Sequence, residues 1–181
     1  MTTHVALLRA VNVAGKNLVP MTVLKALAVE LKLVNPRTLL QSGNLIFEDH
    51  DEAAATVEAR LETAIAARLG VITNVIVRSA AQWQAAIAGN PLAAAASNPN
   101  HLLLICCKQP VPPANVIALM AAIKGRETVR GAGRELYIAY PDGIGRSKLT
   151  AAIIDKHTGS PGTGRNWNTV LKINALLRAP E

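Results

Sequence analysis

The sequence predicts an α+β protein made of two ferredoxin-like (βαββαβ-type) subdomains, arranged in tandem like a duplication. Three observations support this prediction. Hydrophobic residues make up 50% of the 181 residues, which is enough for one domain or two small ones. Short apolar runs alternate with longer segments whose apolar residues recur at helical spacing. The order strand, helix, strand, strand, helix, strand occurs once before residue 80 and begins again after residue 100. No residue-level repeat is visible between the halves.

The first half is expected to span residues 1–90. Pro20 is typical of the first turn of a helix, and Ser42-Gly43-Asn44 indicates a hairpin turn between two strands. Asp49 and Asp51 are candidate N-caps of the second helix in this half. The expected elements are a strand at 5–8, a helix over 20–31, strands at 37–41 and 45–48, a helix from residue 54 that Gly70 ends, a strand at 75–77 and a short helix that Ser79 caps.

A linker is expected at residues 91–100, where proline, asparagine and serine flank an alanine run. The second half is then expected to span residues 101–181 and to close with a C-terminal helix. Its expected elements are a strand at 101–107, a helix from Pro112-Pro113 that Gly125 ends, a hairpin of strands at 127–130 and 135–140, a helix over 147–157 that Gly159 ends, a glycine-rich loop and a helix from about Asn166.

The charge is unevenly distributed along the chain. The formal net charge is +7, and residues 124–181 hold ten of the 19 Lys and Arg but only five of the 12 Asp and Glu. Charged residues make up only 17% of the chain, below the roughly 25% of an average globular protein, so a disordered or acidic-tail protein is excluded. An excess of positive charge suits an anionic partner without identifying it.

The cysteines and the apolar runs indicate a reduced, cytoplasmic protein. Cys106 and Cys107 are adjacent in an expected strand, where neighbouring side chains point to opposite faces, so a disulfide between them is not expected. Both are interpreted as small buried hydrophobic residues. No apolar run approaches the ~20 residues of a membrane span, and the N-terminus lacks a basic region before an apolar one. We therefore expect no membrane partner.

Three loops combine glycine, a cation and small polar side chains near expected helix starts. The first N–H groups of a helix lack intrahelical partners and attract anions, and glycine lets the backbone approach an anion closely. The first loop runs from Asn12 to Asn17 and includes Lys16. A phosphate-binding P-loop has a glycine where this chain has Ala10, and Ser or Thr where it has Asn17. Nucleotide hydrolysis by this loop is therefore not expected. A turn with a solvated lysine explains this loop as well as anion binding does.

The second loop, residues 141–148, is a better candidate. Two glycines precede Arg146, Ser147 and Lys148. Ser147 is expected to cap the following helix, and that alone explains a simple turn. The two cations beside the cap favour anion binding over the simple turn.

The third loop, residues 158–168, again places polar residues at a helix start. Arg165, Asn166 and Asn168 follow several glycines. Asn166 is the expected N-cap of the last helix. Trp167 is interpreted as a core residue rather than a surface on which bases stack.

No catalytic group is identified from the sequence. The four histidines have no metal-ligand spacing, and none pairs with a cysteine in a nucleophile pattern. The chain contains no hydrolase, zinc-protease or dinucleotide-binding motif. We expect no metal and no cofactor. The catalytic residues are unknown, and whether the protein is an enzyme stays open.

Five segments in order carry a family resemblance: residues 7–13 with 15–17, then 20–21, 41–44, 145–150 and 165–170. Together they resemble a bacterial family of uncharacterised proteins that is catalogued as a domain of unknown function, and the resemblance covers nearly the whole chain. It implies two ferredoxin-like subdomains and no reaction. Alanine stands at Ala10 and Ala14 where the family pattern implies glycine, which weakens the first loop as an anion site.

Three functions are compatible with these observations. The first is binding of a phosphorylated small molecule or nucleotide by loops that converge on one crevice, since we expect the loops after the first and third strands of each half at the same sheet edge. The residues expected to contact this ligand are Asn12, Lys16, Asn17, Ser42, Asn44, Arg146, Ser147, Lys148, Arg165, Asn166 and Asn168.

The second function is a nucleic-acid-binding module. The net charge favours it, but only Tyr137 and Tyr140 lie in a hairpin where bases would stack, and no dense basic run is present. The third function is a structural or interaction protein without a small-molecule ligand, whose polar loops serve folding alone. The sequence predicts no oligomeric state.

Overall fold

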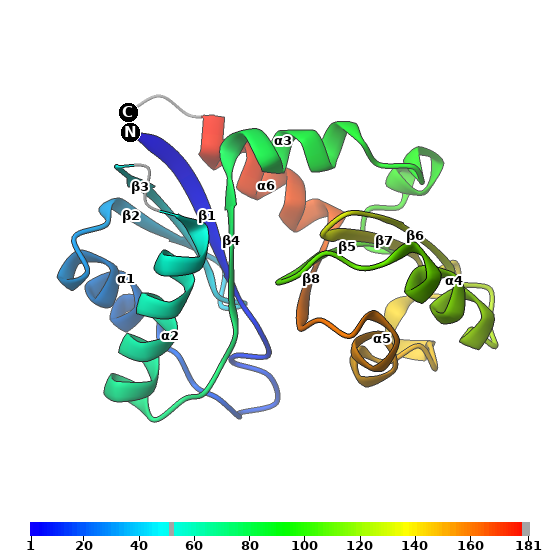
Figure 1. The fold of residues 1–181 in the computed structure, drawn as a ribbon, viewed down its shortest axis with the longest axis horizontal. Helices are drawn as coiled ribbons and strands as arrows, with labels where there is room; N and C mark the ends of the chain where they lie inside the picture. Colours follow the sequence, from blue (N-terminus) through cyan, green and yellow to red (C-terminus); the bar gives the residue numbers. More distant parts are fainter. Residues whose placement is uncertain (51–52, 179–181) are drawn as a thin grey trace. The chain divides into compact units, whose positions relative to one another are not determined.

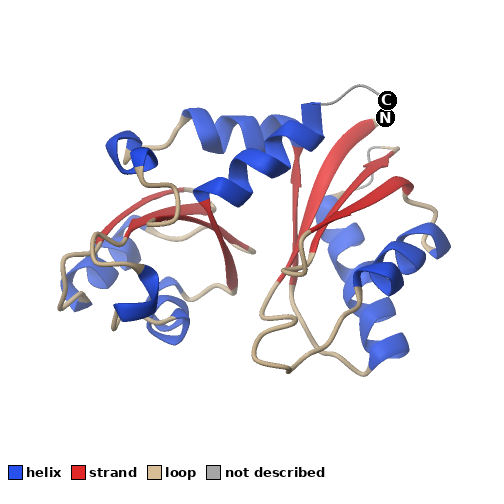
Figure 2. Ribbon diagram, turned by 180° about the vertical axis from the view of Figure 1, so that it is seen from behind, coloured by secondary structure: helices blue, strands red, loops and turns tan. Residues whose placement is uncertain are grey.

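The computed structural model describes residues 1–50 and 53–178. The chain divides into two compact units: residues 1–85 together with the chain from Lys172 onward form unit 1, and residues 86–171 form unit 2. Each unit contains one four-stranded antiparallel sheet with helices (Figure 1, Figure 2). The prediction of an α+β protein with two ferredoxin-like subdomains is therefore confirmed.

Unit 1 has the strand order β2-β3-β1-β4, which is a ferredoxin-like arrangement. The expected order of its elements is confirmed, with boundaries displaced by a few residues. Helices α1 and α2 cover one face of this sheet (Figure 1). The elements are β1 (Thr2–Leu8), α1 (Met21–Glu30), β2 (Val34–Leu39), β3 (Asn44–Asp49), α2 (Ala54–Leu69), β4 (Val75–Ser79) and α3 (Ala80–Ala88), the last of which crosses the boundary between the units.

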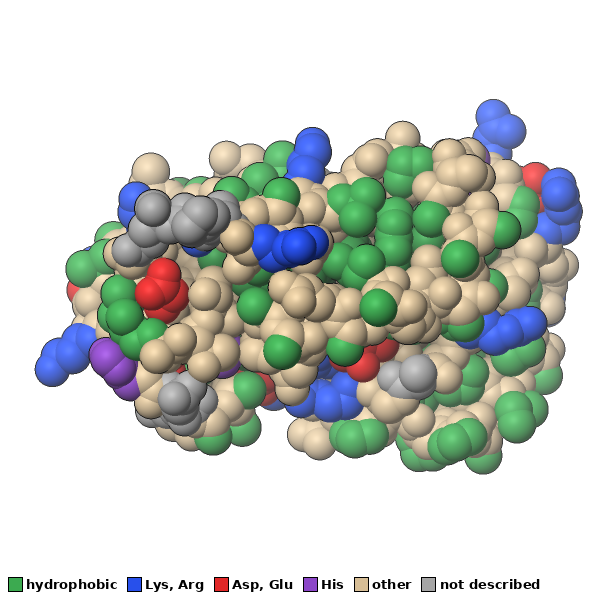
Figure 3. Space-filling model, turned by 90° about the horizontal axis from the view of Figure 1, so that it is seen from above, with side chains coloured by type: hydrophobic (Ala, Val, Ile, Leu, Met, Phe, Trp, Pro, Cys, Tyr) green, Lys and Arg blue, Asp and Glu red, His purple; other side chains and the backbone are tan. Residues whose placement is uncertain are grey.

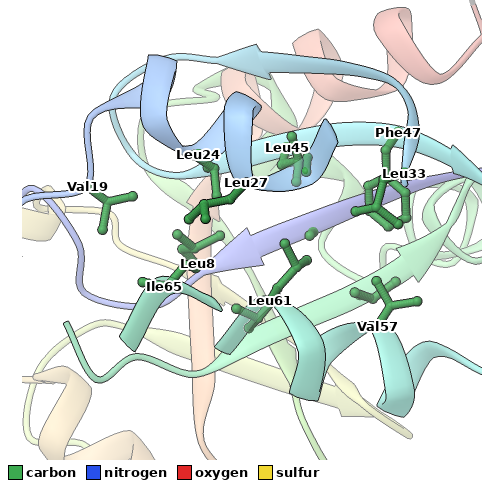
Figure 4. Close-up of a cluster of buried hydrophobic side chains, with 14 of the residues drawn as sticks. Leu8, Val19, Leu24, Leu27, Leu33, Leu45, Phe47, Val57, Leu61 and Ile65 are labelled. Carbon is green, nitrogen blue, oxygen red and sulfur yellow. The ribbon is translucent and has the colours of Figure 1, made fainter. Parts of the chain in front are cut away.

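The hydrophobic core of unit 1 lies between its sheet and these two helices. Strand side chains alternate between faces, so Leu8 and Phe47 face this core from β1 and β3. Leu24 of α1 and Leu61 of α2 complete the same cluster (Figure 4). All four side chains are at most 1% exposed, and burying each contributes roughly 1.5–3 kcal/mol to folding. The apolar spacing of the sequence therefore predicts this core.

Unit 2 repeats the topology of unit 1. Its strand order is β6-β7-β5-β8, so β5 takes the central position that β1 has in the first sheet. Helices α4 and α5 pack against the core cluster of this unit. The elements are η1 (Ala93–Ser97), β5 (Leu102–Cys107), α4 (Pro113–Ala122), β6 (Thr128–Ala132), β7 (Glu135–Ala139), η2 (Ile144–Arg146), α5 (Ala151–Thr158), β8 (Gly162–Asn166) and α6 (Trp167–Arg178), whose last residues belong to unit 1.

Strand β8 lies where the sequence predicts a glycine-rich loop, and that prediction was wrong. Glycine is unfavourable in strands, but here neighbouring side chains require it. A Cβ on Gly162 would lie 2.9 Å from the Ile105 side chain, and a Cβ on Gly164 would lie 2.7 Å from the Leu103 side chain. The two glycines therefore let large aliphatic residues of β5 cover the last strand of the sheet.

Two predicted helix caps were wrong. Helix α5 begins at Ala151, where Thr150 is the N-cap and accepts a hydrogen bond from the Ile153 N–H at 3.4 Å, so Ser147 does not cap it. Asp49 is the last residue of β3 and so does not cap α2, whose N-cap position is taken by Ala53 without a side-chain hydrogen bond. The other candidate cap of α2, Asp51, lies outside the described residues.

The two cysteines lie in β5 as expected. Both are buried, and neither forms a disulfide with another described residue. Cys107 belongs to the core cluster with α4 and α5, and strand alternation sends the Cys106 side chain to the opposite face. The prediction that they do not bond to each other is confirmed.

The strand pairing decides which loops share an edge of each sheet. In unit 1, Leu7 pairs with Asn44, so the loop after β1 lies beside the turn between β2 and β3. In unit 2, Ala139 pairs with Leu102, so the loop after β7 lies at the start of β5. The loops after the first and third strands of a unit therefore lie at opposite edges, because neighbouring antiparallel strands run in opposite directions. Our expectation of a shared edge was wrong.

Candidate functional site

The first loop, between β1 and α1, is held in a compact conformation by its own polar side chains. Asn12 Nδ2 donates to the carbonyl oxygens of Val19 at 2.9 Å and Gln41 at 2.7 Å, and its Oδ1 accepts from the Val19 N–H at 2.8 Å. Asn17 Nδ2 donates to the Ala10 carbonyl oxygen at 3.1 Å. Both amides, which the sequence suggests as ligand groups, stabilise the loop itself.

The adjacent turn between β2 and β3 uses its polar groups in the same way. Asn44 is fully buried, and its Nδ2 donates to the Leu39 carbonyl oxygen at 2.7 Å and to Ser42 Oγ at 3.0 Å. Lys16 differs from these residues, since it is exposed and its side chain has no hydrogen bond or ion pair within residues 1–50 and 53–178. It belongs to unit 1.

Backbone angles explain why glycine is expected at two positions of the first loop. Ala10 and Ala14 have φ of 51° and 49°, in the left-handed region that costs a residue with a Cβ about 1–2 kcal/mol. Both are exposed, so little packing depends on their methyl groups. We expect Ala10→Gly and Ala14→Gly each to raise the free energy of unfolding by about 0.5–1 kcal/mol in urea denaturation. Ala59→Gly, at an exposed position within α2, should instead lower it by about 1 kcal/mol.

Arg165 is a buried residue of β8. It pairs with Leu104, so its side chain leaves the sheet on the face opposite to Ile105 and the α4–α5 core. Its side chain donates to Thr163 Oγ1 at 2.8 Å and to the Gly164 carbonyl oxygen at 2.9 Å, and the residue is 7% exposed. Desolvation lowers its pKa to about 10, which leaves it charged at neutral pH. Its bonds are those of a structural cation.

The start of α6 also uses its polar residues internally. Asn166 Oδ1 accepts from the Thr169 N–H at 3.0 Å, which confirms Asn166 as the N-cap. Asn168 Nδ2 donates to Asn100 Oδ1 at 2.7 Å. Trp167 is 5% exposed, so its interpretation as a core residue is also confirmed.

A cavity of about 400 Å³ opens at one edge of unit 2. It lies between the connection from α4 to β6 and the connection from β7 to α5, which this sheet topology brings together. This volume is within the range of small-molecule sites. Apolar lining comes from residues such as Ile123, Leu149 and Ile153. The charged and hydroxyl groups of its lining belong to Lys124, Arg126, Glu127, Tyr140, Asp142, Arg146, Ser147 and Lys148.

Cations outnumber carboxylates around this cavity. Lys124, Arg146 and Lys148 are exposed, and their side chains make no hydrogen bond or ion pair with any other part of the chain that the structure describes. Arg126 Nη1 donates to Asp142 Oδ1 at 2.8 Å, and because both are exposed this pair contributes at most about 1 kcal/mol. With the Arg126–Asp142 pair and the Glu127 carboxylate taken into account, the lining offers an excess of two positive charges to a ligand.

The inner part of the cavity has a different character. Ser147 Oγ donates a short hydrogen bond to Glu127 Oε1 and accepts one from the Leu149 N–H at 2.9 Å. This arrangement fixes the half-buried carboxylate of Glu127 beside the cations. Tyr140 is 3% exposed, and burial, reinforced by the nearby Glu127 charge, raises its pKa to about 12. Its hydroxyl is therefore protonated at neutral pH and able to donate.

The two tyrosines of β7 and its extension differ in what their hydroxyls contact. Tyr137 donates to the Ala86 carbonyl oxygen at 2.7 Å, whereas the Tyr140 hydroxyl has no hydrogen-bond partner among the described residues. Tyr137→Phe leaves a buried carbonyl oxygen unpaired and is expected to lower the free energy of unfolding by about 1–2 kcal/mol. Tyr140→Phe should change it by less than about 0.5 kcal/mol. Urea denaturation of both variants checks this difference, and equal losses would contradict it.

The structure places part of the predicted ligand set at this cavity. Its second-loop members, Arg146, Ser147 and Lys148, line it together. The third-loop residues lie elsewhere in unit 2, and the candidates before residue 50 belong to unit 1. One consequence of the predicted topology was overlooked. Because β6 and β7 are antiparallel neighbours, the connection that leads into β6 lies beside the connection that leaves β7, at the same edge of the sheet. That edge contributes the residues missed by sequence reasoning, Lys124, Arg126, Glu127, Tyr140 and Asp142.

The described residues offer little support for a nucleic-acid-binding surface, a membrane-spanning helix or a metal site. Tyr137 and Tyr140 are 2% and 3% exposed, so neither ring is an exposed platform for stacked bases. On the face drawn in Figure 3, Lys and Arg side chains are scattered among hydrophobic and polar ones. Within residues 1–50 and 53–178, no helix combines the length and apolarity needed to cross a membrane, and no group of three or more His, Cys, Asp or Glu is placed to hold a metal.

The fold and the cavity define a class: an α+β protein with two ferredoxin-like units and a small-molecule-sized cavity in the second. The chain belongs to the family described as protein of unknown function DUF1697, whose model matches residues 1–137, which confirms the resemblance. A solved structure of a conserved bacterial protein from Streptococcus pneumoniae is similar, with 24% identity and a TM-score of 0.71 over 98% of this chain and 99% of that one. This likeness supports the fold. None of the curated proteins matches the sequence.

Proposed function

We propose that the protein binds a phosphorylated small molecule or nucleotide in the cavity of unit 2. The observation that carries the proposal is the meeting of three cations without intramolecular partners, Lys124, Arg146 and Lys148, around about 400 Å³ of open volume. Side chains of equal charge repel one another, so a surface that gathers them gains from a bound anion. A phosphate group neutralises them and accepts several hydrogen bonds at once.

The lining also suits a ligand that is larger than a bare anion. Ile123, Leu149 and Ile153 provide an apolar wall beside the cations, and small-molecule sites typically combine such walls with a few polar groups. Arg126 is held by Asp142 at the rim. A phosphate ester places its charged end on the cations and its carbon skeleton against this wall.

Titration calorimetry with inorganic phosphate and ribose 5-phosphate, at constant ionic strength, tests the proposal. Arg146→Ala and Lys148→Ala each remove one charge-assisted hydrogen bond, and we expect each to weaken ribose 5-phosphate binding about tenfold, which corresponds to about 1.4 kcal/mol. The matched control is Lys156→Ala, which removes an exposed cation of α5 outside the cavity. It should change the affinity by less than about twofold because exposed charges at a distance are screened.

Two results would refute the proposal. One is that neither phosphate compound binds the wild-type protein. The other is that Arg146→Ala and Lys148→Ala weaken binding no more than Lys156→Ala does, since the ligand would then respond to overall charge rather than to this cavity.

A further inference from the structure

Besides its cations, the cavity is lined by two polar groups of different kinds, the Tyr140 hydroxyl and the Glu127 carboxylate. Tyr140 is 3% exposed, lines the cavity and has no partner for its hydroxyl among the described residues. Although the residue as a whole is buried, its hydroxyl oxygen is open to the cavity, so a ligand there can accept a hydrogen bond from it. Glu127 uses Oε1 to accept from Ser147, and its Oε2 makes no hydrogen bond with the described residues.

These two groups require opposite hydrogen-bonding partners. The Tyr140 phenol, with its pKa raised to about 12, stays protonated and donates to an oxygen acceptor. The Glu127 carboxylate can only accept, and it repels a phosphate brought close to it. A hydroxyl group satisfies both, because it accepts from the phenol with its oxygen and donates to the carboxylate with its hydrogen.

On the basis of the proposed function, we propose that the ligand is a phosphate ester of a sugar, with its phosphate at Arg146 and Lys148 and its hydroxyl groups at Glu127 and Tyr140. The size of the cavity agrees with this class. A water molecule occupies about 30 Å³ of liquid, so about 400 Å³ accommodates a phosphate together with a five- or six-carbon sugar. The apolar wall of Leu149 and Ile153 packs against the C–H groups of the sugar.

The decisive comparison is between ribose 5-phosphate and propyl phosphate, which carry the same charged group but differ in their hydroxyls. Calorimetric titrations of the full chain at pH 7.5 and constant ionic strength give both dissociation constants. Two hydroxyl contacts to buried or charged groups should make ribose 5-phosphate bind about ten times more tightly. Inorganic phosphate, which lacks a carbon skeleton, serves as the third probe.

Glu127→Gln gives a result that a merely structural role would not give. The substitution removes the negative charge that repels phosphate and also removes the strongest acceptor for sugar hydroxyls. We expect it to weaken ribose 5-phosphate binding about three- to tenfold and to leave propyl phosphate binding unchanged or tighter. A loss of cavity structure would weaken both esters alike.

Tyr140→Phe removes one hydroxyl and keeps the ring. It should weaken ribose 5-phosphate binding about three- to tenfold and leave propyl phosphate binding within about twofold. Tyr137→Phe is the matched control, because it also removes a tyrosine hydroxyl from this hairpin. The Tyr137 hydroxyl bonds to the Ala86 carbonyl oxygen and does not line the cavity. It should leave the preference for ribose 5-phosphate intact.

The outcomes separate this inference from the proposed function. Equal affinity for the two esters, with both still dependent on Arg146, overturns the sugar assignment and leaves phosphate binding standing. A preference for ribose 5-phosphate that survives Glu127→Gln and Tyr140→Phe together also overturns the assignment. If no phosphate compound binds, both proposals fail.

Discussion

Arg165→Ala is expected to lower the free energy of unfolding by about 2–4 kcal/mol, although the sequence places Arg165 among the ligand residues. The side chain is 7% exposed and bonded to Thr163 Oγ1 and the Gly164 carbonyl oxygen. Truncation leaves these acceptors without their cation and opens a void on a packed face of the sheet. Both losses belong to the mutations with large effects on stability.

Urea denaturation followed by circular dichroism measures this loss. Lys148→Ala is the matched control, because it removes an exposed cation with no intramolecular partner, and it should change stability by less than about 0.5 kcal/mol. An Arg165→Ala variant that keeps wild-type stability and loses affinity for ribose 5-phosphate would show that Arg165 is a ligand residue after all.

Asn12→Ala is expected to lower the free energy of unfolding by about 2–3 kcal/mol. The side chain makes three hydrogen bonds, two to the backbone of Val19 and one to the Gln41 carbonyl oxygen. Val19 is fully buried, so its N–H and carbonyl lose partners that water does not easily replace. Asn12 also has φ of 56°, a conformation that asparagine tolerates better than alanine does.

Asn12→Asp separates the two contributions in the same denaturation experiment. Aspartate keeps the acceptor for the Val19 N–H and the tolerance of positive φ, but it cannot donate to the two carbonyl oxygens. Its second carboxylate oxygen instead faces the carbonyl oxygens of Val19 and Gln41 and is repelled by them, so Asn12→Asp should be no more stable than Asn12→Ala if the donated bonds dominate. If Asn12→Ala is as stable as wild type and binds phosphate less tightly, the first loop is a ligand site and its internal bonds are incidental.

Much of the fold could be predicted because local sequence signals agree with it. The spacing of Leu24, Leu27 and Ala28 marks the buried face of α1, and Gly70 and Gly159 end helices with φ of 64° and 68°. Strand β8 could not be predicted in this way. Glycine at residues 162 and 164 is typical of a loop when only neighbouring residues are considered. In the folded chain the side chains of Leu103 and Ile105 leave no room for a Cβ at these two strand positions.

The candidate site could be predicted only in part, for a related reason. A polar side chain in a glycine-rich loop has the same sequence signature whether it binds a ligand or its own backbone. Asn12 and Asn44 bond internally, whereas Arg146 has no such partner among the described residues. Which of these applies depends on the groups that the folded chain brings within about 3 Å.

The sequence by itself determined the fold class, the order of strands and helices apart from β8, and the basic character of the second loop, since periodicity, turn residues and charge are local properties. Only the tertiary structure decided that Lys124, Glu127 and Tyr140 join Arg146 at one cavity. These residues come from different connections of the chain, and antiparallel strand pairing is what brings those connections to the same edge of the sheet.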